Sequence, residues 1–170
     1  AKTSSNITGE LDVVLQWRYN PAHDFDPFPD DELGDEKDAL YAAKEPNECR
    51  LALVQGRGLA IKDKNLLSKG GSSDPFARFT VVGGDSDAKP FDSTVKYKTL
   101  QPVWRELFQV PLKQDAEQDK PRVDVVLYDK DEISSPDFMG QVSVDLSGLK
   151  ATKKASRAWH TLLPEEGKSS

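Results

Sequence analysis

The loop of residues 127–140 constrains this chain more than any other stretch, because it places three aspartates between two apolar runs. Apart from Asp124, residues 123–128 are apolar with three valines, which indicates a strand, and alternating apolar residues resume the strand pattern after the loop. We therefore expect the carboxylates of Asp129, Asp131 and Asp137 at one edge of a sheet.

These three carboxylates are close enough in sequence to repel one another. Asp129 and Asp131 are two residues apart, and the Ser-Ser-Pro turn after them can fold the chain back so that Asp137 approaches. Like charges brought close together either raise a pKa or require a cation. Calcium, a hard ion that accepts roughly 6–8 oxygen ligands, resolves the conflict most directly. A solvated acidic loop with splayed side chains is the alternative.

Three further stretches carry polar residues next to strand-like runs, in a recognisable order. They are residues 58–63, residues 73–79 (Ser-Asp-Pro-Phe-Ala-Arg-Phe) and residues 95–106 (Val-Lys-Tyr-Lys-Thr-Leu-Gln-Pro-Val-Trp-Arg-Glu). Together with the loop of residues 128–140, these motifs resemble those of a C2 domain. The composition, with 36% hydrophobic residues and many short strand-like runs, also fits an all-β fold.

The resemblance implies an eight-stranded antiparallel Greek-key β-sandwich with a site for two or three calcium ions at one end. Its five acidic positions fall on Asp63, Asp74, Asp129, Asp131 and Asp137. The carbonyl oxygen near Lys130 and the hydroxyl of Ser134 are further candidate ligands. For Asp63, ion pairing with Lys62, Lys64 or Lys69 is an alternative to metal binding.

Residues 9–19 have apolar side chains at a period of two, which predicts an amphipathic strand. C2 domains of the synaptotagmin type begin with such a strand, and residues 159–162 resemble their closing strand. We therefore expect an N-terminal tail at residues 1–8, the C2 domain at residues 9–163 and a C-terminal tail at residues 164–170.

An acidic insertion is expected at residues 20–47, between the first two strands. Residues 24–38 hold 8 acidic residues and 1 basic residue, whereas the chain has 29 and 23, so the rest is close to neutral. Residues 38–44 have the propensity of a short helix that Pro46 ends. This insertion either docks a basic protein partner through residues 24–38 or is a solvated loop without one.

Two loops carry apolar residues placed to enter a lipid layer. Leu66 and Leu67 lie in the long stretch between Asp63 and Asp74, and Ile133 follows Asp131 by two residues. Burial of one such side chain stabilises by about 1.5–3 kcal/mol, which would add to charge attraction at a membrane. Contact with neighbouring loops is the alternative role for these residues.

Lysines on the expected strand of residues 91–98 form a second candidate lipid site. Lys96 and Lys98 point to one face at a period of two, and Lys89 lies nearby. Family resemblance implies that this face binds phosphoinositide head groups. A solvated lysine face is the alternative.

Other function classes lack support in the sequence. His23 and His160 are far apart, and there is no Gly-x-Ser-x-Gly or phosphate-binding glycine loop, so we expect no enzyme. Basic residues are scattered, which argues against nucleic-acid binding. No apolar run approaches ~18 residues and no signal peptide is evident. The lone Cys49 favours a reducing compartment, so we expect a cytoplasmic protein.

The leading hypothesis is a calcium-dependent phospholipid-binding module that recruits its parent protein to anionic membranes. Its expected partners are phosphatidylserine and, as a second class, phosphoinositides, and it would be a peripheral membrane protein only when calcium is bound. The alternative is a protein-interaction C2 domain in which the acidic insertion is the docking surface and calcium has little effect.

Overall fold

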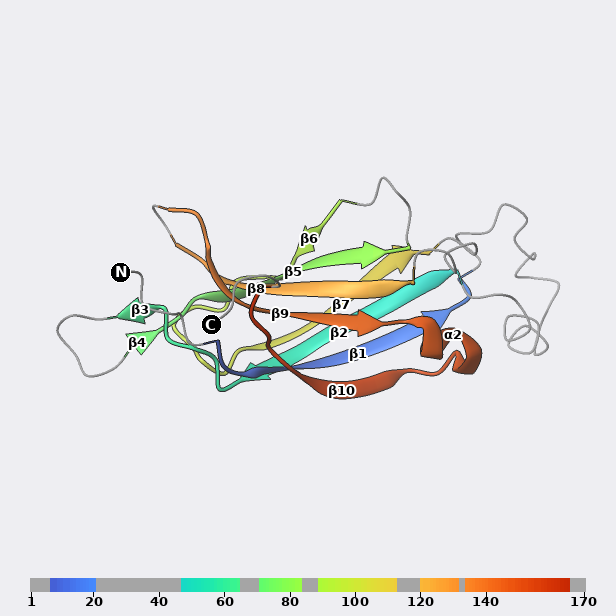
Figure 1. The fold of residues 1–170 in the computed structure, drawn as a ribbon, viewed down its shortest axis with the longest axis horizontal. Helices are drawn as coiled ribbons and strands as arrows, with labels where there is room; N and C mark the ends of the chain where they lie inside the picture. Colours follow the sequence, from blue (N-terminus) through green and yellow to red (C-terminus); the bar gives the residue numbers. More distant parts are fainter. Residues whose placement is uncertain are drawn as a thin grey trace.

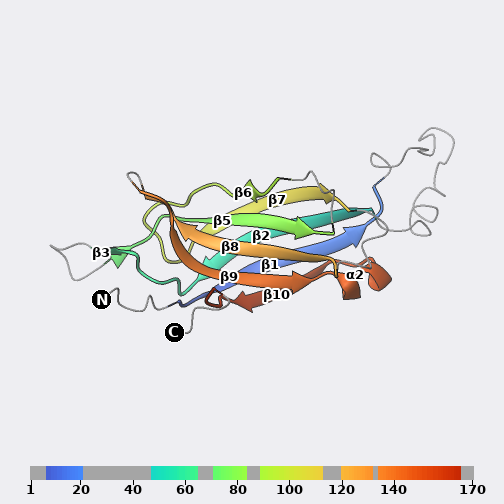
Figure 2. The same ribbon diagram turned by 45° about the horizontal axis from the view of Figure 1, so that its top comes forward.

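Two antiparallel four-stranded sheets face each other in the computed structural model (Figures 1 and 2). The structure describes residues 7–20, 47–64, 71–83, 89–112, 120–131 and 134–165. The first sheet has the order β10-β1-β2-β7, formed by Ser156–Thr161, Glu10–Arg18, Glu48–Arg57 and Val103–Pro111. The second has the order β6-β5-β8-β9, formed by Phe91–Asp92, Pro75–Val82, Arg122–Asp129 and Asp137–Asp145.

These two sheets confirm the expected all-β, eight-stranded antiparallel sandwich. The first and last strands are neighbours, since β1 pairs with β10 and Leu11 lies opposite His160. The closing strand predicted at residues 159–162 is therefore present, although it begins earlier, at Ser156. The acidic insertion and most of the two tails lie outside the described residues.

Two elements were not expected from the sequence. β3 (Asp63–Lys64) and β4 (Gly71–Ser72) form a small antiparallel ribbon beside the main sheets. A helix, α2 (Ser147–Thr152), follows β9. Strands of two residues and a helix of six are too short to show a periodicity in the sequence.

The core between the sheets is filled by the inward side chains of the alternating strands. Phe79 of β5 is fully buried, and its ring centroid lies 5.0 Å from that of Phe108 on β7. Phe91 of β6 is 5.3 Å from Phe79 and 4.9 Å from Phe108. Because β5 and β7 belong to different sheets, these three rings join the two layers.

The stem of the expected insertion is tied together by hydrogen bonds at the end of β1 and the start of β2. The Asn20 backbone N–H donates to Asn47 Oδ1 at 2.6 Å, and Asn47 Nδ2 donates to the Asn20 carbonyl at 3.0 Å. These strand ends lie at the end of the sandwich where α2 lies (Figure 1).

Asp12 on β1 is a charged residue that is buried in the fold. The alternation predicts a polar-face residue, yet Asp12 is only 1% exposed. Its carboxylate accepts bonds from Arg157 Nε at 2.9 Å and Nη2 at 2.5 Å, and from Gln55 Nε2 at 3.1 Å. The hydrogen bond from Arg157 is the main cause that holds the pKa of Asp12 below its usual value, against the effect of burial.

Arg157→Gln should lower the free energy of unfolding at pH 7, and should lower it less at an acidic pH below the ordinary pKa of an aspartate. The folded-state pKa of Asp12 lies below the unfolded one, so the stabilisation is present above the unfolded pKa and is lost as pH falls through the folded pKa. Urea denaturation at both pH values measures this difference. Arg78→Gln is the matched control, because its 2.8 Å pair with Asp92 is exposed and is expected to contribute little. An equal loss at both pH values would contradict the prediction.

Candidate metal centre

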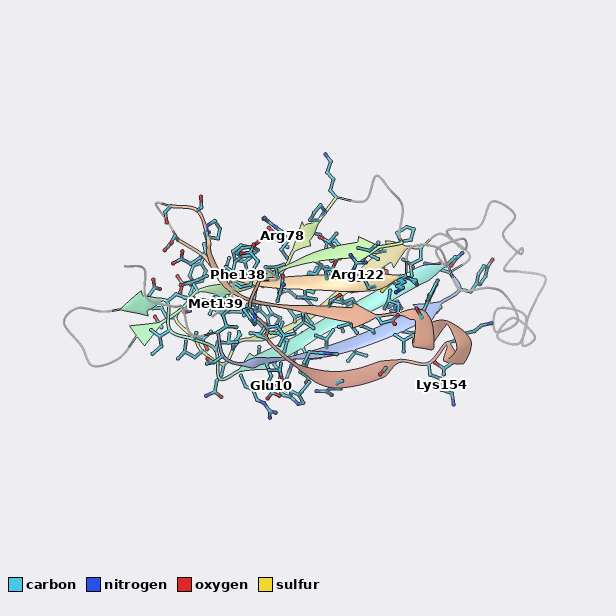
Figure 3. The ribbon with its side chains drawn as sticks, viewed as in Figure 1. Glu10, Arg78, Arg122, Phe138, Met139 and Lys154 are labelled. Atoms are coloured by element: carbon cyan, nitrogen blue, oxygen red, sulfur yellow. The ribbon has the colours of Figure 1, made fainter. Side chains whose placement is uncertain are left out.

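The five aspartates proposed as metal ligands lie at the ends of strands on one side of the sandwich. Asp63 begins β3, Asp74 directly precedes β5, Asp129 ends β8 and Asp137 begins β9, with Asp131 in the loop between the last two. In Figure 1 the connection from β8 to β9 and the β3–β4 ribbon lie at the same end of the molecule. Figure 3 shows Phe138 toward this end and Lys154 at the other.

Strand register explains why residues far apart in sequence meet here. β8 pairs with β5 on one side and with β9 on the other, so Asp129 is opposite both Pro75 and Asp137. The Asp74 N–H donates to Asp129 Oδ1 at 2.5 Å, and the Lys130 N–H donates to the Asp74 carbonyl at 3.0 Å. The two halves of the candidate site are therefore joined by direct hydrogen bonds.

The side chains of Asp74 and Asp131 are each held by one donor. The Lys98 N–H donates to Asp74 Oδ1 at 2.6 Å, and Ser134 Oγ donates to Asp131 Oδ2 at 2.7 Å. Ser134 thus lies beside one of the candidate carboxylates, and its role as a further ligand stays a prediction.

The pKa values of Asp129 and Asp63 are both raised, in part by the charges of neighbouring aspartates. Asp129 is 1% exposed, and burial is the largest cause that raises its pKa to about 6. The hydrogen bond from the Asp74 N–H opposes this shift, while the negative charges of Asp63, Asp74 and Asp131 add to it. The pKa of Asp63 is also raised, first by burial and then by Asp74, Asp131 and Asp137. Such mutual repulsion is what a bound cation would relieve.

Asp129→Asn should raise the stability of the protein in the presence of a chelator at pH 7, by about 1–3 kcal/mol. The folded-state pKa of Asp129 lies above the unfolded one, so its ionised form costs stability at pH 7, and this cost disappears as pH falls through about 6 toward 4. Asparagine keeps an oxygen that can accept the Asp74 N–H. Thermal unfolding at pH 7 and pH 4 measures the gain, which should vanish at the lower pH. A variant less stable than the wild type at pH 7 would count against the shift.

The donor set consists of hard oxygen ligands, which suit calcium and other hard cations better than soft metals. Carboxylates, the Ser134 hydroxyl and the Lys130 carbonyl are hard oxygen donors of the kind that calcium prefers. Over the parts of the chain that the structure describes, no group of three or more His, Cys, Asp or Glu side chains is arranged to hold a metal ion as it stands. The residues fit in chemistry and location, and their side chains would have to turn toward one another to share an ion.

Comparison with known proteins identifies the family. The family model of the C2 domain matches residues 47–162. The chain belongs to the C2 domain family. Among solved structures, a C2 domain of RIM from Drosophila has a TM-score of 0.61 at 18% identity, over 93% of this chain and 100% of that chain. The third C2 domain of the KIAA1228 protein has a TM-score of 0.59 at 18% identity, over 99% and 96%. These two similarities concern the fold.

Curated relatives of this C2 domain are much longer proteins. Tricalbin-3 of Saccharomyces cerevisiae is 34% identical over 117 residues, which is 69% of this chain and 7% of that protein. Human Ras GTPase-activating protein 4B is 31% identical over 123 residues, 71% of this chain and 14% of that protein. Human Multiple C2 and transmembrane domain-containing protein 1 is 34% identical over 99 residues, 58% and 9%. Within the described residues, no helix is long and apolar enough to cross a membrane. C2 domains are generally binding modules rather than catalysts.

The second candidate lipid site of this C2 domain differs from the sequence expectation. β6 ends at Asp92, so the predicted strand to residue 98 is wrong, and the period of two does not place Lys96 and Lys98 on one face. Lys98 instead lies in a turn with a φ of 52°. Beyond Asp92 the segment still bonds the beginning of β5, since the N–H groups of Ser93, Lys96 and Thr99 donate to the carbonyls of Ala77, Pro75 and Ser73. Three residues of this segment thus span two residues of its neighbour, so the regular strand pairing is lost. Lys89 is exposed.

The three residues expected to enter lipid, Leu66, Leu67 and Ile133, lie outside the described residues of this C2 domain. Two exposed apolar side chains that the sequence analysis did not select lie at the same end instead. Ile61, two residues before Asp63, is 44% exposed, and Tyr97, next to Lys98, is 62% exposed. The sequence feature that could have pointed to Tyr97 is its position between Lys96 and Lys98 in the motif of residues 95–106.

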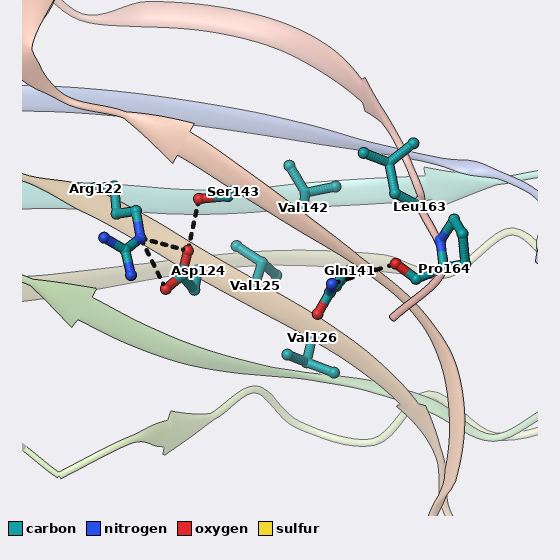
Figure 4. Close-up of a pocket in the computed structure, with 9 residues that line it drawn as sticks. All are labelled: Arg122, Asp124, Val125, Val126, Gln141, Val142, Ser143, Leu163 and Pro164. Carbon is teal, nitrogen blue, oxygen red and sulfur yellow. Dashed lines mark hydrogen bonds and ion pairs between the residues drawn. The ribbon is translucent and has the colours of Figure 1, made fainter. Parts of the chain in front are cut away.

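A pocket of 490 Å³ is lined by residues of β8 and β9 and by Leu163 and Pro164 (Figure 4). It runs along residues 122–126 of β8, whereas Asp129 ends that strand. Its polar side chains bond one another: Arg122 Nε and Ser143 Oγ both donate to Asp124 Oδ1, at 3.1 and 2.6 Å. Because these polar groups already hydrogen-bond one another, the pocket is a weaker candidate for a ligand site than the acidic end, by which we mean the end of the sandwich that carries the five aspartates.

Proposed function

We propose that this C2 domain binds anionic phospholipid membranes when calcium is present and thereby recruits its parent protein to them. The observation that carries the proposal is the buried Asp129, whose pKa is raised to about 6 by burial and by neighbouring aspartates at one end of the sandwich. A metal-free end of this kind repels an anionic surface. Human Multiple C2 and transmembrane domain-containing protein 1, by its name, combines C2 domains with transmembrane domains, which supports a role at membranes.

The proposed ligands divide between side chains and backbone. Asp63, Asp74, Asp129, Asp131 and Asp137 would supply carboxylates, Ser134 its hydroxyl and Lys130 its carbonyl oxygen. Two or three bound calcium ions would supply positive charge and open coordination positions for lipid phosphate. Asp74 and Asp129 already bond through the Asp74 N–H, so ligands from the two loops close on each other with little backbone movement.

Other residues would extend the contact with the membrane. We assign Leu66, Leu67 and Ile133 to insertion among the lipids, and Lys96, Lys98 and Lys89 to contact with phosphatidylserine or phosphoinositide head groups. The protein would then be cytoplasmic and attach peripherally to membranes as calcium rises.

A protein-interaction role is the second candidate, favoured by the charge of residues 24–38, with 8 acidic residues and 1 basic residue. The stem of this segment is fixed by the hydrogen bonds between Asn20 and Asn47. A basic partner would be attracted to such a segment.

Calcium titration followed by vesicle sedimentation tests the proposal. Calorimetry should show calcium binding, and the protein should sediment with vesicles that contain phosphatidylserine only when calcium is present. Absence of both would overturn the proposal and direct attention to residues 24–38. Sedimentation with vesicles in the absence of calcium would support membrane binding and contradict its proposed dependence on calcium.

A further inference from the structure

The turn that carries Tyr97 is fixed to the strand end that carries Asp74. The Thr99 N–H donates to the Ser73 carbonyl at 2.9 Å, and the Lys96 N–H donates to the Pro75 carbonyl at 3.0 Å. Between them, the Lys98 N–H donates to Asp74 Oδ1. Tyr97 is therefore presented from an anchored backbone, although its side chain is 62% exposed.

Lysine charges lie beside the Tyr97 ring. The Nζ atom of Lys130 is 6.0 Å from the ring centroid, within the range of a cation–π contact. The backbone of Lys130 is held in place, because its N–H donates to the Asp74 carbonyl. In sequence Lys130 lies between Asp129 and Asp131. Lys98 directly follows Tyr97 in the turn. The ring is thus accompanied by the Lys130 ammonium, and the next residue along the turn is a second lysine.

Lys98 has a backbone conformation that is uncommon for a residue other than glycine, with a φ of 52°. Its N–H reaches the Asp74 carboxylate in this conformation. One carboxylate oxygen therefore anchors the turn and belongs to a candidate metal ligand. The position of Tyr97 is linked in this way to the metal centre.

An aromatic ring with a hydroxyl group suits the boundary between water and lipid, where the ring meets apolar chains and the hydroxyl remains hydrated. Lysines beside it suit lipid phosphates. A free phosphate would engage the lysines alone, whereas only a membrane offers an apolar layer to the ring. The exposure of Tyr97 therefore favours a lipid surface.

We infer that Tyr97, with Lys98 and Lys130, forms a lipid contact. Tyr97 and Lys98 lie on the turn between β6 and β7, and Lys130 follows β8. The ring would lie at the level of the lipid head groups and the lysines would contact lipid phosphates. This inference rests on the proposed membrane binding. It adds Tyr97, on the turn between β6 and β7, to the segments that carry Leu66, Leu67 and Ile133, and it pairs Lys98 with Tyr97 rather than with the lysine face expected on residues 91–98.

Tyr97→Ala and Tyr97→Trp, in the whole 170-residue chain, test the inference. Sedimentation with vesicles of phosphatidylcholine and phosphatidylserine in calcium should show roughly fivefold weaker binding for the alanine variant and near wild-type binding for tryptophan. Leu107→Ala is the matched control, because Leu107 is 55% exposed and lies opposite Ala52 in the middle of β2. It should bind as the wild type does.

Calorimetry without vesicles separates a lipid contact from an effect on the metal centre. The inference requires that Tyr97→Ala bind calcium like the wild type. Equal vesicle binding by wild type and Tyr97→Ala would overturn the inference and leave the proposed function standing. Weaker calcium binding in solution would make Tyr97 a positioning residue and also overturn it. A wild type that fails to bind vesicles would overturn both.

Discussion

Asp129→Asn combined with Asp131→Asn is expected to abolish calcium-dependent sedimentation with phosphatidylserine vesicles and to weaken calcium binding by roughly a hundredfold or more. The two substitutions remove two negative charges from the proposed ligand set, and calcium affinity depends on the number of charged ligands. Asparagine at position 129 can still accept the Asp74 N–H, so the two halves of the site remain joined. Calorimetric titration measures the affinity directly.

Asp124→Asn provides the matched control for this double variant. Asp124 is also an aspartate of β8, but it bonds Arg122 and Ser143 in the pocket of Figure 4, away from the acidic end. It should leave calcium binding unchanged. Calcium affinity that survives in the double variant would show that Asp129 and Asp131 are not ligands, even if the protein still bound membranes.

Phe79→Ala is expected to lower the free energy of unfolding by about 3–5 kcal/mol, the largest stability effect that we predict for one substitution. The ring is fully buried and contacts Phe91 and Phe108, so its removal leaves a cavity between the two sheets. A loss of this size is a large part of the about 5–15 kcal/mol that stabilises a typical domain. Urea denaturation followed by circular dichroism measures it.

Two further variants define the reason for that loss. Phe79→Leu keeps an apolar side chain in the space and should cost clearly less than alanine. Leu107→Ala removes an exposed leucine and is expected to change stability by under about 0.5 kcal/mol. If Phe79→Ala cost no more than Leu107→Ala, the three-ring contact would not be what joins the sheets.

Much of the fold could be read from the sequence because sheet strands leave a local signature. The period of two over residues 9–19 predicted a strand, and β1 covers Glu10–Arg18. The apolar run before the acidic loop predicted another, and β8 covers Arg122–Asp129. Resemblance to C2 motifs added what periodicity does not carry, namely a closing strand at residues 159–162, and the structure then showed that it pairs with the first strand.

The location of the candidate site also followed from the sequence, in part. Aspartates that directly precede or follow strands must lie at a sheet edge, and the structure has Asp74, Asp129 and Asp137 there. Their role as calcium ligands stays a prediction. The lysine face did not follow, because β6 ends at Asp92 and the residues after it bond the neighbouring segment without regular strand pairing.

The sequence by itself determined the long strands and that Asp74, Asp129 and Asp137 lie next to strand ends, because both depend on neighbours along the chain. Only the tertiary structure decided which charges are buried and which loop side chains are exposed. The buried Asp12 accepts a hydrogen bond from Arg157, 145 residues away in the chain. The turn that carries Tyr97 is held by a hydrogen bond from the Lys98 N–H to Asp74, 24 residues earlier. Such contacts leave no periodicity in the sequence, since they arise when strands from distant segments pair and bring their side chains together.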